Sequence, residues 1–142
     1  MLIYECGCLT ALYKQSKFNI ATEWRSKLDE FARDNGIQTF NPAITYLSER
    51  SYNFDPKLCV DQNRYYLDKA DILVAQLDYI HLSPGSIWEL TYAKEKKNIP
   101  VLAFGQEPSW SPHIMNCVSI LVKDIDEVIN ILITMFNQSF KK

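Results

Sequence analysis

The sequence has little of several features that would assign a protein class directly. It has no uninterrupted apolar run near the roughly 18 residues that a membrane-spanning helix needs, and its first residues lack the basic stretch of a secretory signal. It has two histidines and no C-x-x-C pair, so no zinc ligand set is visible. Lys and Arg number 15 against 17 acidic residues, which leaves no net positive charge to hold a nucleic-acid backbone. We therefore expect a cytoplasmic protein that contacts neither membranes nor polymeric nucleic acid and holds no metal.

What the sequence does contain is typical of one globular domain. Its 142 residues are 47% hydrophobic and 13% aromatic, which excludes a disordered chain and suffices for one core. No internal repeat or linker divides it, so residues 1–142 are predicted to form a single domain. The four cysteines are predicted to be reduced, and most of them to be buried.

Apolar periodicity predicts strands that alternate with helices. Strands are predicted at residues 2–6, 37–40, 71–78, 100–104 and 118–122. Helices are predicted at residues 18–35, 56–68, 83–97 and 124–136. Residues 43–55 show no clean period and are predicted to be a loop with room for a helical turn.

This alternation predicts the fold class. Residues 71–78 are almost continuously apolar between two acids, which is typical of a strand covered on both faces in a parallel sheet. Right-handed crossovers then give an α/β three-layer sandwich with a parallel, flavodoxin/Rossmann-like five-stranded sheet. Ligands bind such sheets beyond the carboxyl ends of the strands, so the loops at 6–11, 78–85 and 105–112 are the candidates.

One of these loops leads into a segment with possible chemistry, Ser83-Pro84-Gly85-Ser86-Ile87-Trp88-Glu89. If Glu89 lies in the first turn of a helix, the helix dipole favours its charged form, as a nucleophile requires. The same residues allow a structural interpretation, because Ser86 and Glu89 have the S-x-x-E spacing of a capping box. Spacing alone favours the capping box.

Three stretches together resemble the nucleoside 2-deoxyribosyltransferase family. They are Tyr66-Leu67-Asp68-Lys69-Ala70-Asp71-Ile72-Leu73-Val74-Ala75-Gln76-Leu77-Asp78, the turn from Pro84 to Glu89 with Leu90 to Ala93, and Lys97-Asn98-Ile99-Pro100-Val101. The opening Ile3-Tyr4-x-x-Gly7 is similar to the first strand and loop of that family. The resemblance covers roughly residues 1–105.

The resemblance implies roles for individual residues. Glu89 matches the catalytic carboxylate that attacks the anomeric carbon, and Tyr4 matches a tyrosine that holds this glutamate. Asp61 is similar in placement to an aspartate that handles protons on the base. Asn116 matches a residue that reaches a neighbouring subunit's pocket. Gly7, Gly85 and Ser86 belong to the implied substrate-binding turns.

Two further positions complete the expected substrate site. Asp78, at the end of its strand, either bonds a sugar hydroxyl or caps the following turn. Ser83 stands where the transferases have an acid, and in this it resembles the related deoxynucleoside 5'-monophosphate N-glycosidases, whose serine binds the phosphate. The glycine-rich first loop of those hydrolases is absent, since Gly7 is the one glycine there.

These residues predict deoxyribosyl transfer between bases through a glutamate nucleophile, without cofactor, on a small-molecule nucleoside or nucleotide. The alternatives are a 5'-monophosphate N-glycosidase and a non-catalytic module that binds a nucleotide signal. An apolar C-terminal helix and aromatics near Trp110 predict a homodimer or higher homo-oligomer.

Overall fold

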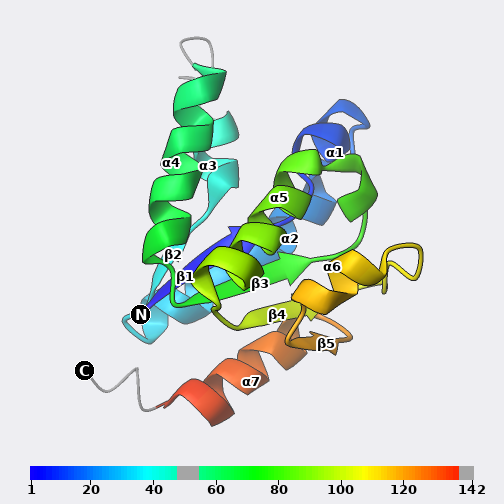
Figure 1. The fold of residues 1–142 in the computed structure, drawn as a ribbon. Coiled ribbons are helices and arrows are strands. Elements are labelled where there is room, and N and C mark those ends of the chain that lie inside the picture. The colour runs from blue at the N-terminus through cyan, green and yellow to red at the C-terminus, as the bar shows by residue number, and fades with distance from the viewer. Residues whose placement is uncertain (48–54, 138–142) are drawn as a thin grey trace.

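The computed structural model describes residues 1–47 and 55–137, which form a five-stranded sheet with all neighbouring strands parallel (Figure 1). The strand order is β2-β1-β3-β4-β5. The strands are β1 (Leu2–Cys6), β2 (Gln38–Phe40), β3 (Ile72–Gln76), β4 (Val101–Phe104) and β5 (Ile120–Val122). All five lie within the predicted segments.

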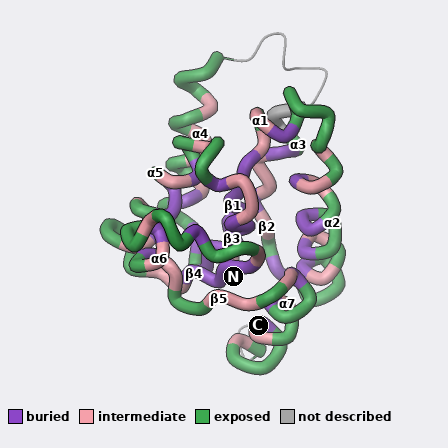
Figure 2. The backbone as a smooth tube through the Cα atoms, turned by 90° about the vertical axis from the view of Figure 1, so that its right-hand side faces the viewer, coloured by how far each residue is buried: buried purple, intermediate pink, exposed green. Residues whose placement is uncertain are grey.

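Helices cover both faces of the sheet, so the molecule has three layers (Figure 2). One face is covered by α4 (Pro56–Lys69), α5 (Pro84–Tyr92) and α6 (Pro112–Cys117). The other face is covered by α2 (Phe18–Asp34) and α7 (Ile125–Phe136). The predicted α/β three-layer sandwich is therefore confirmed.

The helix boundaries follow local chemistry. Asp55 caps α4, because its carboxylate accepts hydrogen bonds from the backbone N–H groups of Lys57 and Leu58, and Pro56 fits the first helical position. Helix α2 is followed by Gly36, whose φ of 67° is the left-handed conformation that glycine adopts without strain.

Three short α-helices lie outside the predicted helices, and one of them is α6, which lies just before the predicted strand at 118–122. Helix α1 (Thr10–Lys14) follows the first strand after the loop at residues 7–9. Helix α3 (Pro42–Leu47) occupies the start of the predicted loop at 43–55, whereas residues 48–54 of that loop lie outside the described residues. A π-helical turn (Ala93–Lys97) continues α5 to the predicted end at residue 97.

Strand β1 sends alternate side chains to opposite faces of the sheet, as a period of two requires. Tyr4 and Cys6 join the core beneath α4 and α5, while Ile3 packs in the core beneath α2 and α7. Glu5 lies on the Ile3 side and faces Arg25 of α2. One strand therefore contributes to both sides of the molecule.

The strand order places a switch point between β1 and β3. From β1 the chain moves outward to β2, and from β3 it moves the other way to β4 and β5. The loops that leave β1 and β3 consequently diverge at their carboxyl ends and open a crevice, where open α/β sheets bind ligands. In the described part of the chain, no helix is both long and apolar enough to cross a membrane.

Candidate active site

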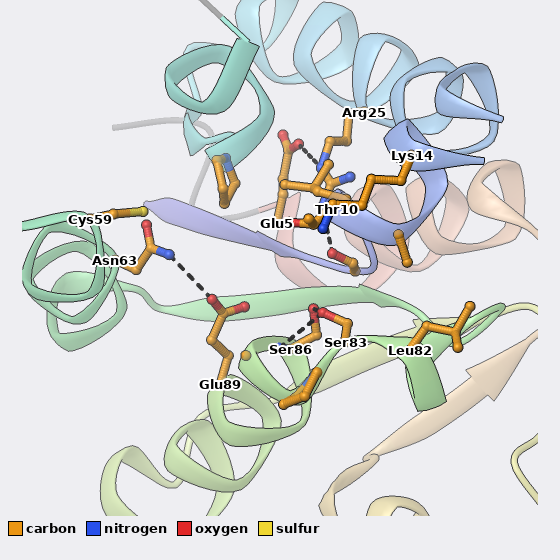
Figure 3. A pocket seen from close by; sticks show the side chains of 16 residues that line it. Glu5, Thr10, Lys14, Arg25, Cys59, Asn63, Leu82, Ser83, Ser86 and Glu89 are labelled. Carbon is orange, nitrogen blue, oxygen red and sulfur yellow. Dashed lines mark hydrogen bonds and ion pairs between the residues drawn. The ribbon is translucent and has the colours of Figure 1, made fainter. Parts of the chain in front are cut away.

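A cavity of about 410 Å³ lies at this switch point (Figure 3). Its walls come from the end of β1 and the following loop, from α1 and α2, from the start of α3, from α4, and from the first turns of α5 with the residues just before them. Two of the three predicted ligand loops thus meet there. The third, at 105–112, lines a separate cavity of about 350 Å³ with Asp78.

Glu89 is held in the larger cavity by side chains from two other elements. It is 8% exposed, and its Oε1 accepts a hydrogen bond of 3.0 Å from the Tyr4 hydroxyl. The Asn63 amide on α4 donates a longer bond of 3.5 Å to the same oxygen, and Figure 3 shows these two side chains pointing toward each other. The carboxylate is therefore oriented by β1 and α4 and faces the cavity.

The capping-box interpretation of Glu89 is wrong. Ser83, not Ser86, is the N-cap of α5, and the Ser86 N–H that a capping box would give to Glu89 donates instead to Ser83 Oγ at 3.4 Å. Glu89 is the sixth residue of α5, beyond the first turn, where the helix dipole acts most strongly. The prediction that the helix dipole keeps Glu89 charged is therefore also wrong.

Burial governs the protonation of Glu89. Desolvation raises the pKa of Glu89 to about 7, although the hydrogen bonds from Tyr4 and Asn63, the nearby Cys6 thiol and the charge of Arg25 act to lower it. The acid is about half ionised near neutral pH, rather than fully ionised as we expected. A carboxyl group poised in this way changes charge within the physiological range.

The donors around Glu89 stay neutral. Burial, followed by the Glu89 charge, raises the pKa of Tyr4 well above its usual range. Burial likewise raises the pKa of Cys6, whose thiol donates to the Ser86 carbonyl at 3.4 Å. Tyr4 therefore stays a neutral phenol near pH 7, where its hydroxyl donates to the Glu89 carboxylate.

The N-terminus of α5 forms a polar wall of the cavity. The hydroxyls of Ser83 and Ser86 are 2.8 Å apart and hydrogen-bonded, and Gly85 lies between them in the sequence. Gly7 faces them from the loop after β1, and the exposed Lys14 of α1 contributes an ammonium group at the rim. Hydroxyls, a helix N-terminus and a cation together suit a polar or anionic group.

Three predicted site residues lie away from this cavity. Asp61 is exposed on α4, because Cys59 and Asn63, four residues apart, turn the other face of that helix to the cavity. Asp78 lines the second cavity and accepts from the Gln106 N–H at 3.1 Å, so it neither meets Glu89 nor caps its own turn. Asn116 is exposed on α6 and does not line the cavity of its own chain.

The sequence analysis missed a buried pair of polar side chains, Arg25 and Glu5, that lines the cavity opposite α5. Arg25 Nε lies 3.6 Å from Glu5 Oε2, and their side chains are 1% and 0% exposed. Arg25 lies on the apolar stripe of α2, because it follows Ala21 by four residues and precedes Leu28 by three. This spacing could have indicated that Arg25 is buried. In residues 1–47 and 55–137, no three His, Cys, Asp or Glu side chains converge as metal ligands would.

The fold and the cavity define an α/β sandwich protein with a buried, tyrosine-held glutamate at its switch point. No protein-family model and no curated protein matches the sequence. Solved structures do match, and the chain has the fold of a 2-deoxyribosyltransferase from the psychrotolerant bacterium Bacillus psychrosaccharolyticus. That likeness has a TM-score of 0.66 at 20% identity and covers 92% of this chain and 91% of the other. A conserved protein from Enterococcus faecalis V583 is similar too, with a TM-score of 0.69, 17% identity, and coverage of 92% and 95%.

Proposed function

We propose that this protein cleaves the N-glycosidic bond of a 2'-deoxynucleoside and transfers the deoxyribosyl group to a second base, with Glu89 as the nucleophile. The observation that carries this proposal is the Tyr4–Glu89 hydrogen bond inside a cavity at the switch point of the sheet. The likeness to the 2-deoxyribosyltransferase fold supports it.

The mechanism follows from the position of the carboxylate. Cleavage makes the sugar oxocarbenium-like, and a carboxylate oxygen beside C1' captures it in a glycosyl–enzyme ester while the bond electrons leave with the base. The departing base takes up a proton from solvent. A second base then attacks C1' through a ring nitrogen, gives that nitrogen's proton to solvent, and releases Glu89 unchanged. Two displacements at one carbon retain the configuration at C1'. A 2-deoxy sugar ionises readily because it has no electron-withdrawing 2'-hydroxyl.

Tyr4 and Asn63 orient the nucleophile. Both donate to Oε1, which leaves Oε2 as the oxygen for C1'. A donor on one oxygen also stabilises the charged carboxylate. Asp61 has no part in this mechanism, since it lies on the exposed face of α4.

A second candidate is hydrolysis of a deoxynucleoside 5'-monophosphate. The observation that favours it is the Ser83–Ser86 hydroxyl pair at the N-terminus of α5, with Lys14 at the rim. No acidic side chain interrupts this wall between Ser83 and Ser86, so a phosphate meets donors there.

The experiment incubates the protein with deoxyinosine plus adenine, and separately with a deoxynucleoside monophosphate alone, and follows base exchange and base release. Exchange supports the transferase, and release from the monophosphate supports the hydrolase. Glu89→Ala should lower either rate by at least about a thousandfold, while the exposed control Glu30→Ala on α2 leaves it unchanged. Ligand binding without turnover would instead support a binding module.

Ser83→Ala separates the two substrate classes. If Ser83 Oγ contacts a 5'-phosphate, the variant should raise KM for the monophosphate about tenfold, because one hydrogen bond to a charged group is lost. KM for the nucleoside should change little. Equal changes for both substrates would assign Ser83 to the helix cap alone.

A further inference from the structure

Glu89 requires a source of positive potential that its own helix does not supply. It lies beyond the first turn of α5, and it is almost completely buried. A carboxylate in such a place is destabilised unless a cation or several donors compensate it. Arg25 is the one buried cation among the residues that the structure describes, and it lines the same cavity from the opposite side.

The Arg25 guanidinium is held rigidly. Nη1 donates to the Ala21 carbonyl at 2.8 Å, and Nη2 donates a longer bond of 3.5 Å to the Gly7 carbonyl at the end of β1. Its Cζ lies 4.5 Å from the centre of the Trp24 ring. With its side chain 1% exposed, this charge is screened by solvent far less than that of the exposed Lys14.

The partner of Arg25 does not cancel its charge. Neither oxygen of Glu5 accepts a hydrogen bond from any described donor, which would be costly for a buried carboxylate. Instead, its neighbour is the Asp29 carboxyl group, and two acids close together favour holding one proton between them. Burial and the Asp29 charge raise the pKa of Glu5, so Glu5 carries that proton and is neutral.

Asp29 has hydrogen-bond donors of its own. The Thr39 hydroxyl donates to its Oδ1 at 2.5 Å and the Asn41 amide donates to its Oδ2 at 2.9 Å. These donors satisfy an ionised carboxylate. Asp29 is partly exposed and does not line the cavity, whereas Glu5 and Arg25 do.

We propose that Arg25 is a positioning residue for Glu89: beside a neutral Glu5, its buried charge acts through the cavity and stabilises the carboxylate form of the nucleophile. The catalytic consequence rests on the function proposed above. The electrostatic statement itself concerns only these side chains.

The other groups that face Glu89 are uncharged. They are Tyr4 and Cys6 on β1, Cys59 and Asn63 on α4, and Ser86 on α5. Burial raises the pKa of each of the three that titrate, Tyr4, Cys6 and Cys59, and keeps them neutral near pH 7. Unlike these neighbours, Arg25 carries a full positive charge, and this charge lowers the pKa of Glu89.

The test is the pH profile of kcat/KM, whose acidic limb reports the free enzyme's essential base. Arg25→Met should move the midpoint of that limb upward by about one pH unit, which lowers kcat/KM about tenfold on the acidic side and leaves the alkaline plateau close to wild type. Arg25→Lys keeps the charge, so the midpoint of its acidic limb should stay close to that of the wild type. The matched control is Arg33→Met, since Arg33 is exposed on the same helix. A loss that is equal at every pH would overturn the proposal.

A second variant guards against misfolding. Glu5→Gln combined with Arg25→Met removes both partners, so no unpaired acid is left, and the same upward shift is expected. In addition, the Glu89 carboxyl can be titrated by 13C NMR on glutamate-labelled protein, with Glu89→Gln to assign the resonance. If the wild-type protein cleaves no nucleoside or nucleotide, the proposed function fails while the NMR titration still tests Arg25. An unshifted Glu89 titration in the double variant would refute the role of Arg25.

Discussion

At the scale of single residues, the main feature is an acid that the fold keeps in a costly place. Glu89 has two donors on one oxygen, yet burial still raises its pKa to about 7 from the usual 4.5. The folded protein therefore binds a proton at Glu89 more tightly than the unfolded chain does. Between these two values stability must fall as the pH rises, because the unfolded state releases that proton more easily.

Glu89→Gln should therefore stabilise the protein at alkaline pH. The amide has nearly the same shape, keeps an oxygen for the Tyr4 hydroxyl, and carries no charge to bury. At pH 8 we expect a gain on the order of 2–3 kcal/mol in the free energy of unfolding, which shrinks toward zero by pH 5. Urea unfolding at several pH values measures it. A gain that is constant with pH would contradict the raised pKa of Glu89.

Tyr4→Phe tests the hydrogen bond itself. The variant removes the 3.0 Å donor and little else, because the ring keeps its place in the core. We expect the acidic limb of kcat/KM to move upward, with activity at pH 6 about tenfold lower or more, since the phenol favours the charged carboxylate. The circular dichroism spectrum should remain that of the wild type. A profile that keeps its acidic midpoint would mean that the hydroxyl does not act on Glu89.

Sequence reasoning found Glu89 and Tyr4 but not their surroundings. The two side chains meet across 85 positions of sequence, and it was the resemblance to a known family, rather than any local spacing, that brought them together. The burial of Arg25 was not predicted, because a charged residue in an amphipathic helix is assumed to face solvent. Its position among the apolar residues of α2 nevertheless buries it in the protein. The raised pKa of Glu89 depends on burial in three dimensions, which no single segment encodes.

At the scale of elements, the loops after β3 and β4 are fixed by a close approach of backbone and side chain. Gly105 has a φ of 98°, and a Cβ at this position would overlap the Asp78 carboxylate. That carboxylate also accepts the Gln106 N–H. Asp78 therefore joins two neighbouring loops instead of reaching the sugar site that the sequence suggested.

Gly105→Ala should consequently destabilise the protein by about 2 kcal/mol or more, through positive-φ strain and the clash with Asp78. Gly85→Ala is the matched control, because a Cβ there meets nothing within 4 Å and the residue lies in the first turn of α5. It should be neutral or slightly stabilising. Thermal unfolding of both variants measures the difference. Equal melting temperatures would show that the loop adapts without cost.

The elements themselves were largely predictable. Continuous apolar runs identified the buried strands, and the period of α2 identified its helix. The face of α4 was not predictable, because its apolar and polar residues do not separate cleanly, and Asp61 entered the predicted site through the family resemblance alone. Short helices such as α1 and α3 contain too few residues to show a period.

At the scale of the whole molecule, a single chain leaves large apolar side chains exposed. Trp110 is 56% exposed beside the second cavity, and Met135 on α7 is 74% exposed. Such side chains commonly mark contacts between subunits. We therefore still propose a homo-oligomer in which Asn116, exposed on α6, reaches a neighbouring site.

Sedimentation equilibrium across a range of concentrations measures this assembly. We expect a dimer or larger species, and Trp110→Asp should shift the equilibrium toward monomer, because a charge would be buried in the contact. If Asn116 completes a neighbour's pocket, Asn116→Ala should raise KM without dissociating the oligomer. A monomer at every concentration would remove both expectations.

The alternation of side chains along β1 has a consequence for how this protein can change over generations. Tyr4 and Glu5 are adjacent, yet they serve opposite sides of the sheet. An inserted or deleted residue in this five-residue strand would exchange their directions and dismantle both arrangements together. Variation at the site must therefore proceed by substitution within an unvarying strand length, while the loops beyond Cys6 remain open to length changes.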